Sequence, residues 1–147
     1  MTVDGKSAGA RTRFTLAENN AAFKADPRTL TVTLGDTLLT DRFYKGRCFH
    51  ALACDLPYGV QHESRDGQSR VSLDKLMARA LQAWKKTLFP GAAVALSFNA
   101  NTLPLTDARE MLATAGFEPL TGGPYDGLSH WVEQAITRDV AVARFPG

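Results

Sequence analysis

The sequence predicts an α/β fold in which strands alternate with helices and form a mostly parallel sheet with helices on its faces. Two mainly apolar runs, residues 48–54 and 92–98, are typical of buried parallel strands. Between them, apolar residues recur every three or four positions from Leu73 to Leu88, which predicts an amphipathic helix. A chain of 147 residues with 44% hydrophobic content is long enough for one domain with one core.

The first third of the chain predicts one helix and one strand. Residues 8–25 have mixed polarity with spaced apolar side chains, so we expect a helix that ends at Asp26. Residues 30–34 alternate apolar and polar side chains and are rich in β-branched residues, which predicts a strand. Residues 41–47 are polar and predict a connection to the first apolar strand.

A long polar segment precedes the predicted central helix. Residues 60–71 show no periodicity and predict a loop, and loops of such length tend to be functional or disordered. Ser72 is placed to cap the helix that follows, and Pro90 with Gly91 ends it.

The last third predicts one further helix and two further strands. Thr106 is expected to cap a short helix, and Gly116 suits the position just after its end. Residues 117–120 and 139–145 are expected to be strands.

Composition limits the class of protein. The net charge of +2 and the pI near 8.7 permit a nucleic-acid partner without requiring one. No apolar stretch approaches the length of a membrane span, and the polar first residues show no secretory signal. Cys48 and Cys54 lie in one predicted strand, too far apart to bridge, so we expect reduced thiols in a cytoplasmic protein without a zinc site.

The strongest functional signal is the segment Asp55-Leu56-Pro57-Tyr58-Gly59, directly after an apolar strand. Ligands of open α/β sheets bind at the carboxyl ends of strands. A carboxylate and a backbone carbonyl that accept hydrogen bonds from an aryl amine free its lone pair for attack. Pro57 restricts Leu56 to an extended conformation, and the Tyr58 ring offers a stacking face for a base. The alternative is an ordinary turn at the end of a strand.

This segment resembles the acidic/amide-Pro-Pro-Tyr motif of S-adenosyl-L-methionine-dependent amino-methyltransferases that act on nucleic-acid bases. More narrowly, Asp55–Gln61 and Ser129–Arg144 resemble the catalytic domain of tRNA guanosine-N2 methyltransferases, and the similarity runs from about Leu30 to Phe145. The resemblance implies a Rossmann-like class I methyltransferase sheet with helices on both faces, S-adenosyl-L-methionine as cofactor, and tRNA as partner. It also implies that Asp55 contacts the target amine.

By the same resemblance, Tyr58 is the stacking aromatic residue, whereas Leu56 stands where the family usually has proline. Guanine N2 in tRNA is the implied target. Adenine N6 in RNA or DNA is the alternative within the same chemistry. A catalytically inactive remnant, or a module that binds RNA or protein, is the alternative of a different class.

Two further acids correspond to cofactor ligands of that family. Asp36 corresponds to the acid after the third strand, which holds the adenine amine of the cofactor, and a plain turn is its alternative reading. Asp4 corresponds to the acid that ends the second strand and holds the ribose. The family's glycine-rich first strand and loop have no counterpart here, so we expect residues 1–147 to form one partial methyltransferase domain lacking the first βα unit. The exposed edge of the strand around Ala51 would then favour a homodimer.

Polar residues beside the motif are candidates for substrate contacts. In the long loop, Arg65 and Arg70 would contact phosphates and His62 would relay a proton, although a solvated loop explains them equally well. Asn99 and Asn101 follow the second apolar strand, where we expect them at the same edge of the sheet as turn formers.

Overall fold

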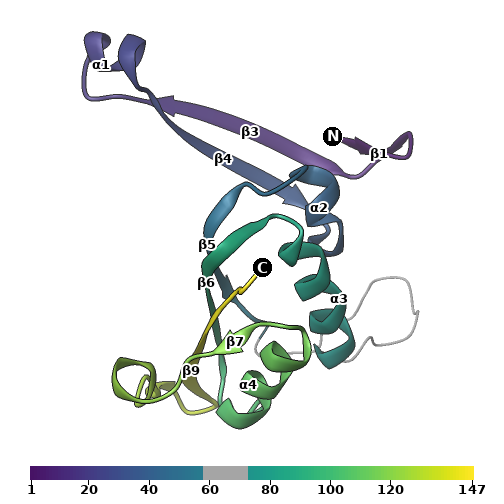
Figure 1. Cartoon of the computed structure of the whole chain (residues 1–147), viewed down its shortest axis with the longest axis vertical. Coiled ribbons are helices and arrows are strands. Elements are labelled where there is room, and N and C mark those ends of the chain that lie inside the picture. The colour runs from purple at the N-terminus through teal and green to yellow at the C-terminus, as the bar shows by residue number, and fades with distance from the viewer. Residues whose placement is uncertain (58–72) are drawn as a thin grey trace.

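A computed structural model of the chain describes residues 1–57 and 73–147. Figure 1 shows two regions, a long two-stranded ribbon and a sheet covered by two helices, joined by a short helical segment. The predicted loop 60–71 and the predicted cap Ser72 lie outside the described residues. No helix in the described part of the chain is long and apolar enough to cross a membrane.

The sheet has five strands and is mixed. In the described residues only β5 and β6 pair in parallel, whereas β9 is antiparallel to β6, β7 and β8. The prediction of a mostly parallel sheet is therefore wrong. The chain reverses direction after β6, and β9 returns antiparallel beside it. The strands are β5 (Phe49–Asp55), β6 (Leu88–Asn99), β7 (Glu118–Pro119), β8 (His130–Glu133) and β9 (Ile136–Arg144).

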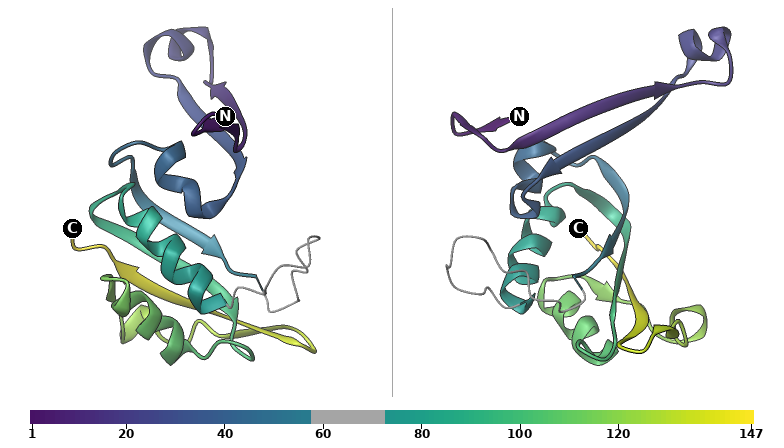
Figure 2. Two further views of the ribbon diagram at one scale, coloured as in Figure 1. Left: turned by 90° about the vertical axis from the view of Figure 1, so that its right-hand side faces the viewer. Right: turned by 180° about the vertical axis from the view of Figure 1, so that it is seen from behind.

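Helices α3 (Leu73–Lys85) and α4 (Leu105–Thr114) cover one face of this sheet (Figure 2). Both helices and both apolar strands were predicted, with bounds shifted by a few residues. The core forms where alternate residues of β6 and β9 meet the apolar stripes of the helices. Its most deeply buried side chains include Leu81, Leu88, Val94, Leu96, Phe98 and Leu112.

The other face of the sheet is open, which corrects the expectation of helices on both faces. Along β5, outward-facing residues such as Ala51 and Ala53 are exposed, and no helix of the described residues covers them. The apolar run of β5 predicted burial on both faces of the sheet, but the residues on its open face include alanines that are exposed. Alanine is small enough to be tolerated at a solvent-facing position.

The N-terminal region is mostly β-structure. A small hairpin of β1 (Thr2–Val3) and β2 (Lys6–Ser7) precedes the ribbon, which we define as β3 (Gly9–Leu16) and β4 (Arg28–Gly35). The ribbon extends away from the sheet (Figures 1 and 2). The strand predicted at residues 30–34 is confirmed as part of β4.

The helix predicted over residues 8–25 is wrong in its first half. Residues 9–16 pair one by one with β4, and this long-range pairing outweighs the weak helical pattern. Only α1 (Asn20–Ala25) is helical. The Asn19 side chain caps it by accepting a hydrogen bond from the Ala22 amide at 2.9 Å, and Asp26 follows its end as predicted.

A joint of two short helices connects the ribbon to the sheet. It consists of a 3₁₀ helix (Thr37–Leu39) and α2 (Thr40–Phe43), so the connection expected at 41–47 is partly helical. Trp84 of α3 donates its indole N–H to the Thr37 hydroxyl at 3.0 Å, and Lys86 pairs with Asp41 at 2.7 Å. These contacts fix the joint to the end of α3.

The two predicted ends of α4 have different outcomes. Gly116 follows the helix with a φ of +84°, which confirms its predicted place. Thr106 does not cap the helix. The cap residue is Pro104, which makes no side-chain cap bond, and the Thr106 hydroxyl instead bonds the Asp107 carboxylate at 3.0 Å.

Candidate functional site

The carboxyl ends of β5 and β6 meet at one edge of the sheet. The parallel register places Asp55 beside Ser97, and the Leu56 amide donates to the Ser97 carbonyl at 2.8 Å. The segment Asp55-Leu56-Pro57 therefore lies where the sequence predicted, at the edge where open α/β sheets bind ligands.

Leu56 anchors this segment in the core. Its side chain is 2% exposed, whereas Asp55 is exposed and Pro57 is half-buried. Because successive side chains of a strand point to opposite faces, the buried leucine holds Asp55 on the open side of the sheet. A carboxylate and the Leu56 carbonyl are thus carried by one short, fixed piece of backbone.

The thiol next to Asp55 is held in its protonated form. Burial, and to a smaller extent the negative charge of Asp55, raise the pKa of Cys54 above its ordinary value. At neutral pH the thiolate fraction is therefore small, which lowers the reactivity of this cysteine. Both cysteines are free, and Cys48 is exposed. The edge thus offers hydrogen-bond acceptors rather than a thiolate.

The two asparagines at this edge are structural. The side-chain oxygen of Asn99 (Oδ1) accepts from the backbone amides of Asn101 at 3.1 Å and Thr137 at 3.3 Å. The side-chain amides of Asn99 and Asn101 both donate to the Ala135 carbonyl, at 3.1 and 3.2 Å. They fasten the turn between β8 and β9 to the end of β6, which confirms that they are turn formers.

That turn brings an exposed tryptophan to the same edge. Trp131 of β8 pairs with Thr137, whose carbonyl accepts from the Ala100 amide just beyond β6, and the Trp131 residue is 72% exposed. Three strand spacings, about 14 Å, separate β8 from β5. The sequence did not predict β8, because four residues are too few for a clear alternation. Its signal is a bulky aromatic residue before a polar turn.

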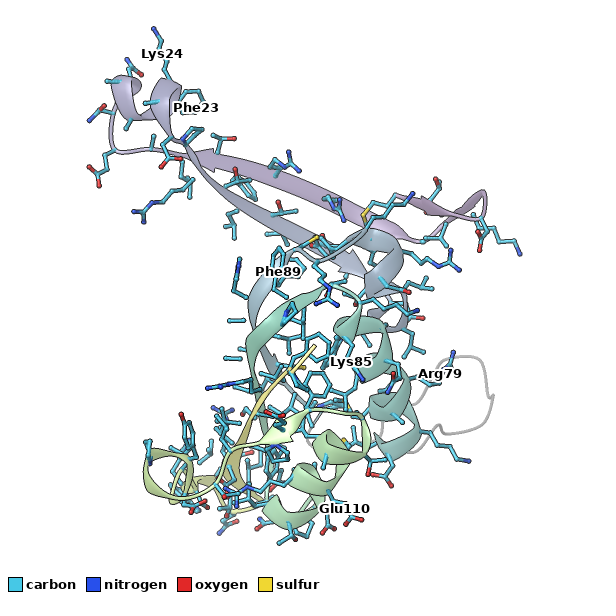
Figure 3. The ribbon with its side chains drawn as sticks, in the orientation of Figure 1. Phe23, Lys24, Arg79, Lys85, Phe89 and Glu110 are labelled. Atoms are coloured by element: carbon cyan, nitrogen blue, oxygen red, sulfur yellow. The ribbon has the colours of Figure 1, made fainter. Side chains whose placement is uncertain are left out.

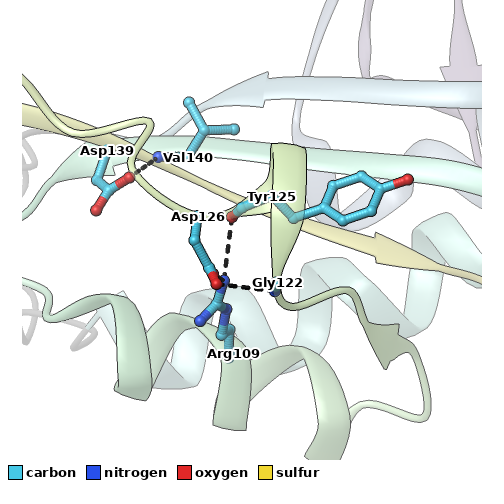
Figure 4. Close-up of polar contacts among 6 residues, drawn as sticks. All are labelled: Arg109, Gly122, Tyr125, Asp126, Asp139 and Val140. Carbon is cyan, nitrogen blue, oxygen red and sulfur yellow. Dashed lines mark hydrogen bonds and ion pairs between the residues drawn. The ribbon is translucent and has the colours of Figure 1, made fainter.

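A clamp on α4 fixes the chain that leads to β8 (Figure 4). Arg109 donates to the Asp126 carboxylate at 2.5 Å and to the Tyr125 carbonyl at 3.1 Å. The second oxygen of Asp126 accepts from the Gly122 amide at 2.8 Å. The Arg109 hydrogen bond, followed by the Gly122 bond, lowers the pKa of Asp126 below its ordinary value.

The predicted cofactor acids lie elsewhere. Asp36 caps the 3₁₀ helix by accepting from the Leu38 amide at 2.9 Å, next to Thr37, which contacts the last turn of α3. This is the amino end of β5, so the length of a seven-residue strand, about 20 Å, separates Asp36 from Asp55. Asp4 lies in the turn between β1 and β2 with a φ of +48°.

The described residues therefore do not bring Asp36 together with Asp55. The reason is that β4 pairs with β3 and not with the five-stranded sheet, so Asp36 does not reach the edge that Asp55 occupies. The cofactor roles of Asp36 and Asp4 stay predictions. The predicted site residues Tyr58, His62, Arg65 and Arg70 lie outside the described residues.

Comparison with known proteins gives a likeness in fold. No protein-family model and no curated protein matches the chain. Three solved structures of one protein from Thermus thermophilus, named as a candidate DNA modification methylase, do match. The first has a TM-score of 0.51 at 15% identity and covers 78% of this chain and 53% of that one.

The other two structures are the selenomethionine derivative and the complex with S-adenosyl-L-methionine. The derivative matches with a TM-score of 0.51 at 18% identity, over 77% of this chain and 51% of that one. The complex matches with a TM-score of 0.53 at 17% identity, over 78% of this chain and 54% of that one. The chain is thus similar in fold to part of these structures, and it spans about half the length of the structures it matches.

Proposed function

We propose that this chain supplies the amine-binding edge of an S-adenosyl-L-methionine-dependent methyltransferase that acts on an exocyclic amine of a nucleic-acid base. The observation that carries the proposal is the position of Asp55-Leu56-Pro57 at the carboxyl end of β5, beside the parallel strand β6. The likeness to a methylase fold solved with S-adenosyl-L-methionine supports it.

The chemistry follows from two acceptors on one rigid segment. An aryl amine is a weak nucleophile because its lone pair is delocalised into the ring. The Asp55 carboxylate and the Leu56 carbonyl would accept hydrogen bonds from the amine, orient it, and stabilise the positive charge that grows on nitrogen. The cofactor, when bound, supplies an electrophilic methyl group. Loss of the carboxylate should cost about 3 kcal/mol of barrier, roughly a hundredfold in rate.

Guanine N2 in tRNA is the target we propose, with the cytoplasm as the location. The resemblance of Asp55–Gln61 and Ser129–Arg144 to tRNA guanosine-N2 methyltransferases is the basis of this choice. The second of these segments contains Trp131, whose exposed indole at the same edge provides a stacking surface for an unpaired base.

Adenine N6 is the second candidate target, and DNA is its favoured polymer. The observation in its favour is that the matched structures belong to a protein named for DNA modification. A binding module without catalysis is a third candidate, because Asp36, one of the two predicted cofactor acids, lies about a strand length from Asp55.

Nucleoside analysis in cells separates these candidates. Deletion of the coding gene should remove N2-methylguanosine from tRNA, as measured by mass spectrometry of digested nucleic acid. Complementation with the wild-type gene should restore it, as should Glu110→Ala, a change at an exposed carboxylate on α4. Asp55→Ala should not. Loss of N6-methyladenine instead would identify the second candidate, and unchanged nucleosides would support the binding module.

We expect the 147-residue chain to bind the cofactor product S-adenosylhomocysteine only weakly. About half of each matched structure has no counterpart in these residues, and the predicted cofactor acids are not gathered at Asp55. Isothermal titration calorimetry measures the affinity. A micromolar dissociation constant would contradict this expectation and would mean that the chain forms a cofactor site on its own.

A further inference from the structure

The ribbon exposes a continuous apolar face. Its register places Phe14 opposite Leu30 and Ala10 opposite Leu34, so these side chains share one face. Six of the eight large hydrophobic residues that are exposed in the described part of the chain lie between residues 14 and 34. Their exposure ranges from 47% to 76%. The ribbon apolar face consists of Phe14, Leu16, Leu30, Val32 and Leu34.

The opposite face of the ribbon is polar and turns toward the joint. The Thr33 hydroxyl bonds the Tyr44 hydroxyl at 2.7 Å, and Arg11 donates to the Phe43 carbonyl at 2.7 Å. The ribbon is therefore seated on the joint by its polar side. Its apolar side faces water, and an isolated two-stranded ribbon in water is only marginally stable.

The open face of the sheet is apolar along β5 and β6. Two of its rows run across three strands: one consists of Ala51, Ala93 and Arg144, and the other of Ala53, Ala95 and Val142. The four alanines are small, so bulkier apolar side chains can pack on them beside Arg144. We define Ala51, Ala53, Ala93, Ala95 and Val142 as the sheet open face.

The two faces do not meet within one chain. The ribbon projects away from the sheet, and its tip with Phe23 and Lys24 is far from the five-stranded sheet (Figure 3). A second copy of the chain, however, offers both surfaces. We propose that two copies associate reciprocally, with the ribbon apolar face of each copy packed on the sheet open face of the other. This is the arrangement of a two-fold dimer, in which the same contact between a ribbon and a sheet occurs twice.

The area of contact favours this arrangement over simpler ones. Eight-residue strands give the ribbon a length of about 27 Å and, at about 10 Å in width, a face of roughly 270 Å². Stacking of ribbon on ribbon would bury two such faces, roughly 540 Å², which is below the ~1,000 Å² of a specific interface. Reciprocal packing buries four faces, roughly 1,100 Å². Pairing of two β5 edges would leave all four faces in water.

Disulfide trapping tests the geometry directly. In a background without native cysteines (Cys48→Ser, Cys54→Ala), one chain carries Val32→Cys and a second, of different size, carries Ala95→Cys. Circular dichroism first establishes that each variant is folded. After mixing and mild oxidation, we expect cross-linked pairs that contain one chain of each kind. Cross-linking of Val32→Cys with itself would mean ribbon-on-ribbon stacking and would overturn the proposal.

Sedimentation velocity provides the second measurement. The wild-type chain should sediment as a dimer at micromolar concentration. Val32→Asp should raise the dissociation constant of the dimer at least tenfold. Thr29→Asp, on the exposed polar face of the same ribbon, is the matched control and should remain dimeric. A monomeric wild-type chain, or intramolecular cross-linking of a chain that carries both cysteines, would refute the reciprocal dimer.

Discussion

The ribbon and the sheet region use similar strands but bury them to opposite extents. β4 alternates Leu30, Val32 and Leu34 with threonines, much as β6 alternates Val94 and Leu96 with smaller residues. Yet no described residue before Leu56 is buried, whereas the core extends from there to Phe145. The difference is that α3 and α4 cover the apolar side of β6, while nothing in the described chain covers the apolar side of β4. Apolar alternation forms a strand, but a packed neighbour is needed to stabilise it.

Matched leucine truncations should show the largest contrast between the regions. Leu96→Ala removes a fully buried side chain and leaves a cavity, at a cost of about 3–4 kcal/mol of unfolding free energy. Leu30→Ala, at a residue that is 52% exposed, should cost less than about 0.5 kcal/mol in dilute protein. Urea unfolding followed by circular dichroism measures both. Equal losses would indicate that the ribbon face is covered in solution.

The joint between the regions should respond next most strongly. Thr37→Val removes the acceptor of the Trp84 indole N–H, and Trp84 is only 6% exposed. Leaving this donor unpaired should cost about 1–3 kcal/mol. Thr37→Ser retains the hydroxyl and is the control. The same unfolding experiment compares them, and a neutral Thr37→Val would show that water satisfies the indole.

The contrast also explains which parts of the fold could be predicted. The central helix, both apolar strands and the position of Gly116 were predictable, because periodicity and glycine chemistry report on local structure. The strand pairing of residues 9–16 was not, since it depends on a partner in β4. The mixed sheet with one covered face likewise depends on long-range packing.

The candidate site divides in the same way. Asp55 is the last residue of its strand, so its position at the carboxyl edge could be predicted from local sequence. Asp36 follows a strand, but its location depends on which sheet that strand joins, and β4 joined the ribbon. Trp131 reaches the site edge only because β8 folds back on β9. A residue's position could be predicted where it depends only on the end of its own strand. It could not be predicted where it depends on which other strand that strand pairs with.

Within the sheet region, the clamp on Asp126 should depend on pH. Because the folded state lowers the pKa of Asp126, its contribution is present above the ordinary carboxyl pKa and is lost as pH falls through the lowered value. Protonation of Asp126 should therefore weaken the hydrogen bond that its carboxylate accepts from the Gly122 amide. The amide shift of Gly122 in two-dimensional NMR reports this. Asp126→Asn is the control and should abolish the transition, whereas a midpoint at or above the ordinary pKa would contradict it.

The smallest effect concerns Cys54 at the site edge. Burial is the larger cause of its raised pKa and the charge of Asp55 the smaller, so Asp55→Asn should lower the thiol pKa without returning it to the ordinary value of 9.0. The pH dependence of alkylation by iodoacetamide, in a Cys48→Ser background, measures it. Asp107→Asn on α4 is the charge-matched control and should leave the profile unchanged. If Asp55→Asn also left the profile unchanged, burial alone would account for the raised pKa of Cys54, and the predicted effect of the Asp55 charge would be wrong.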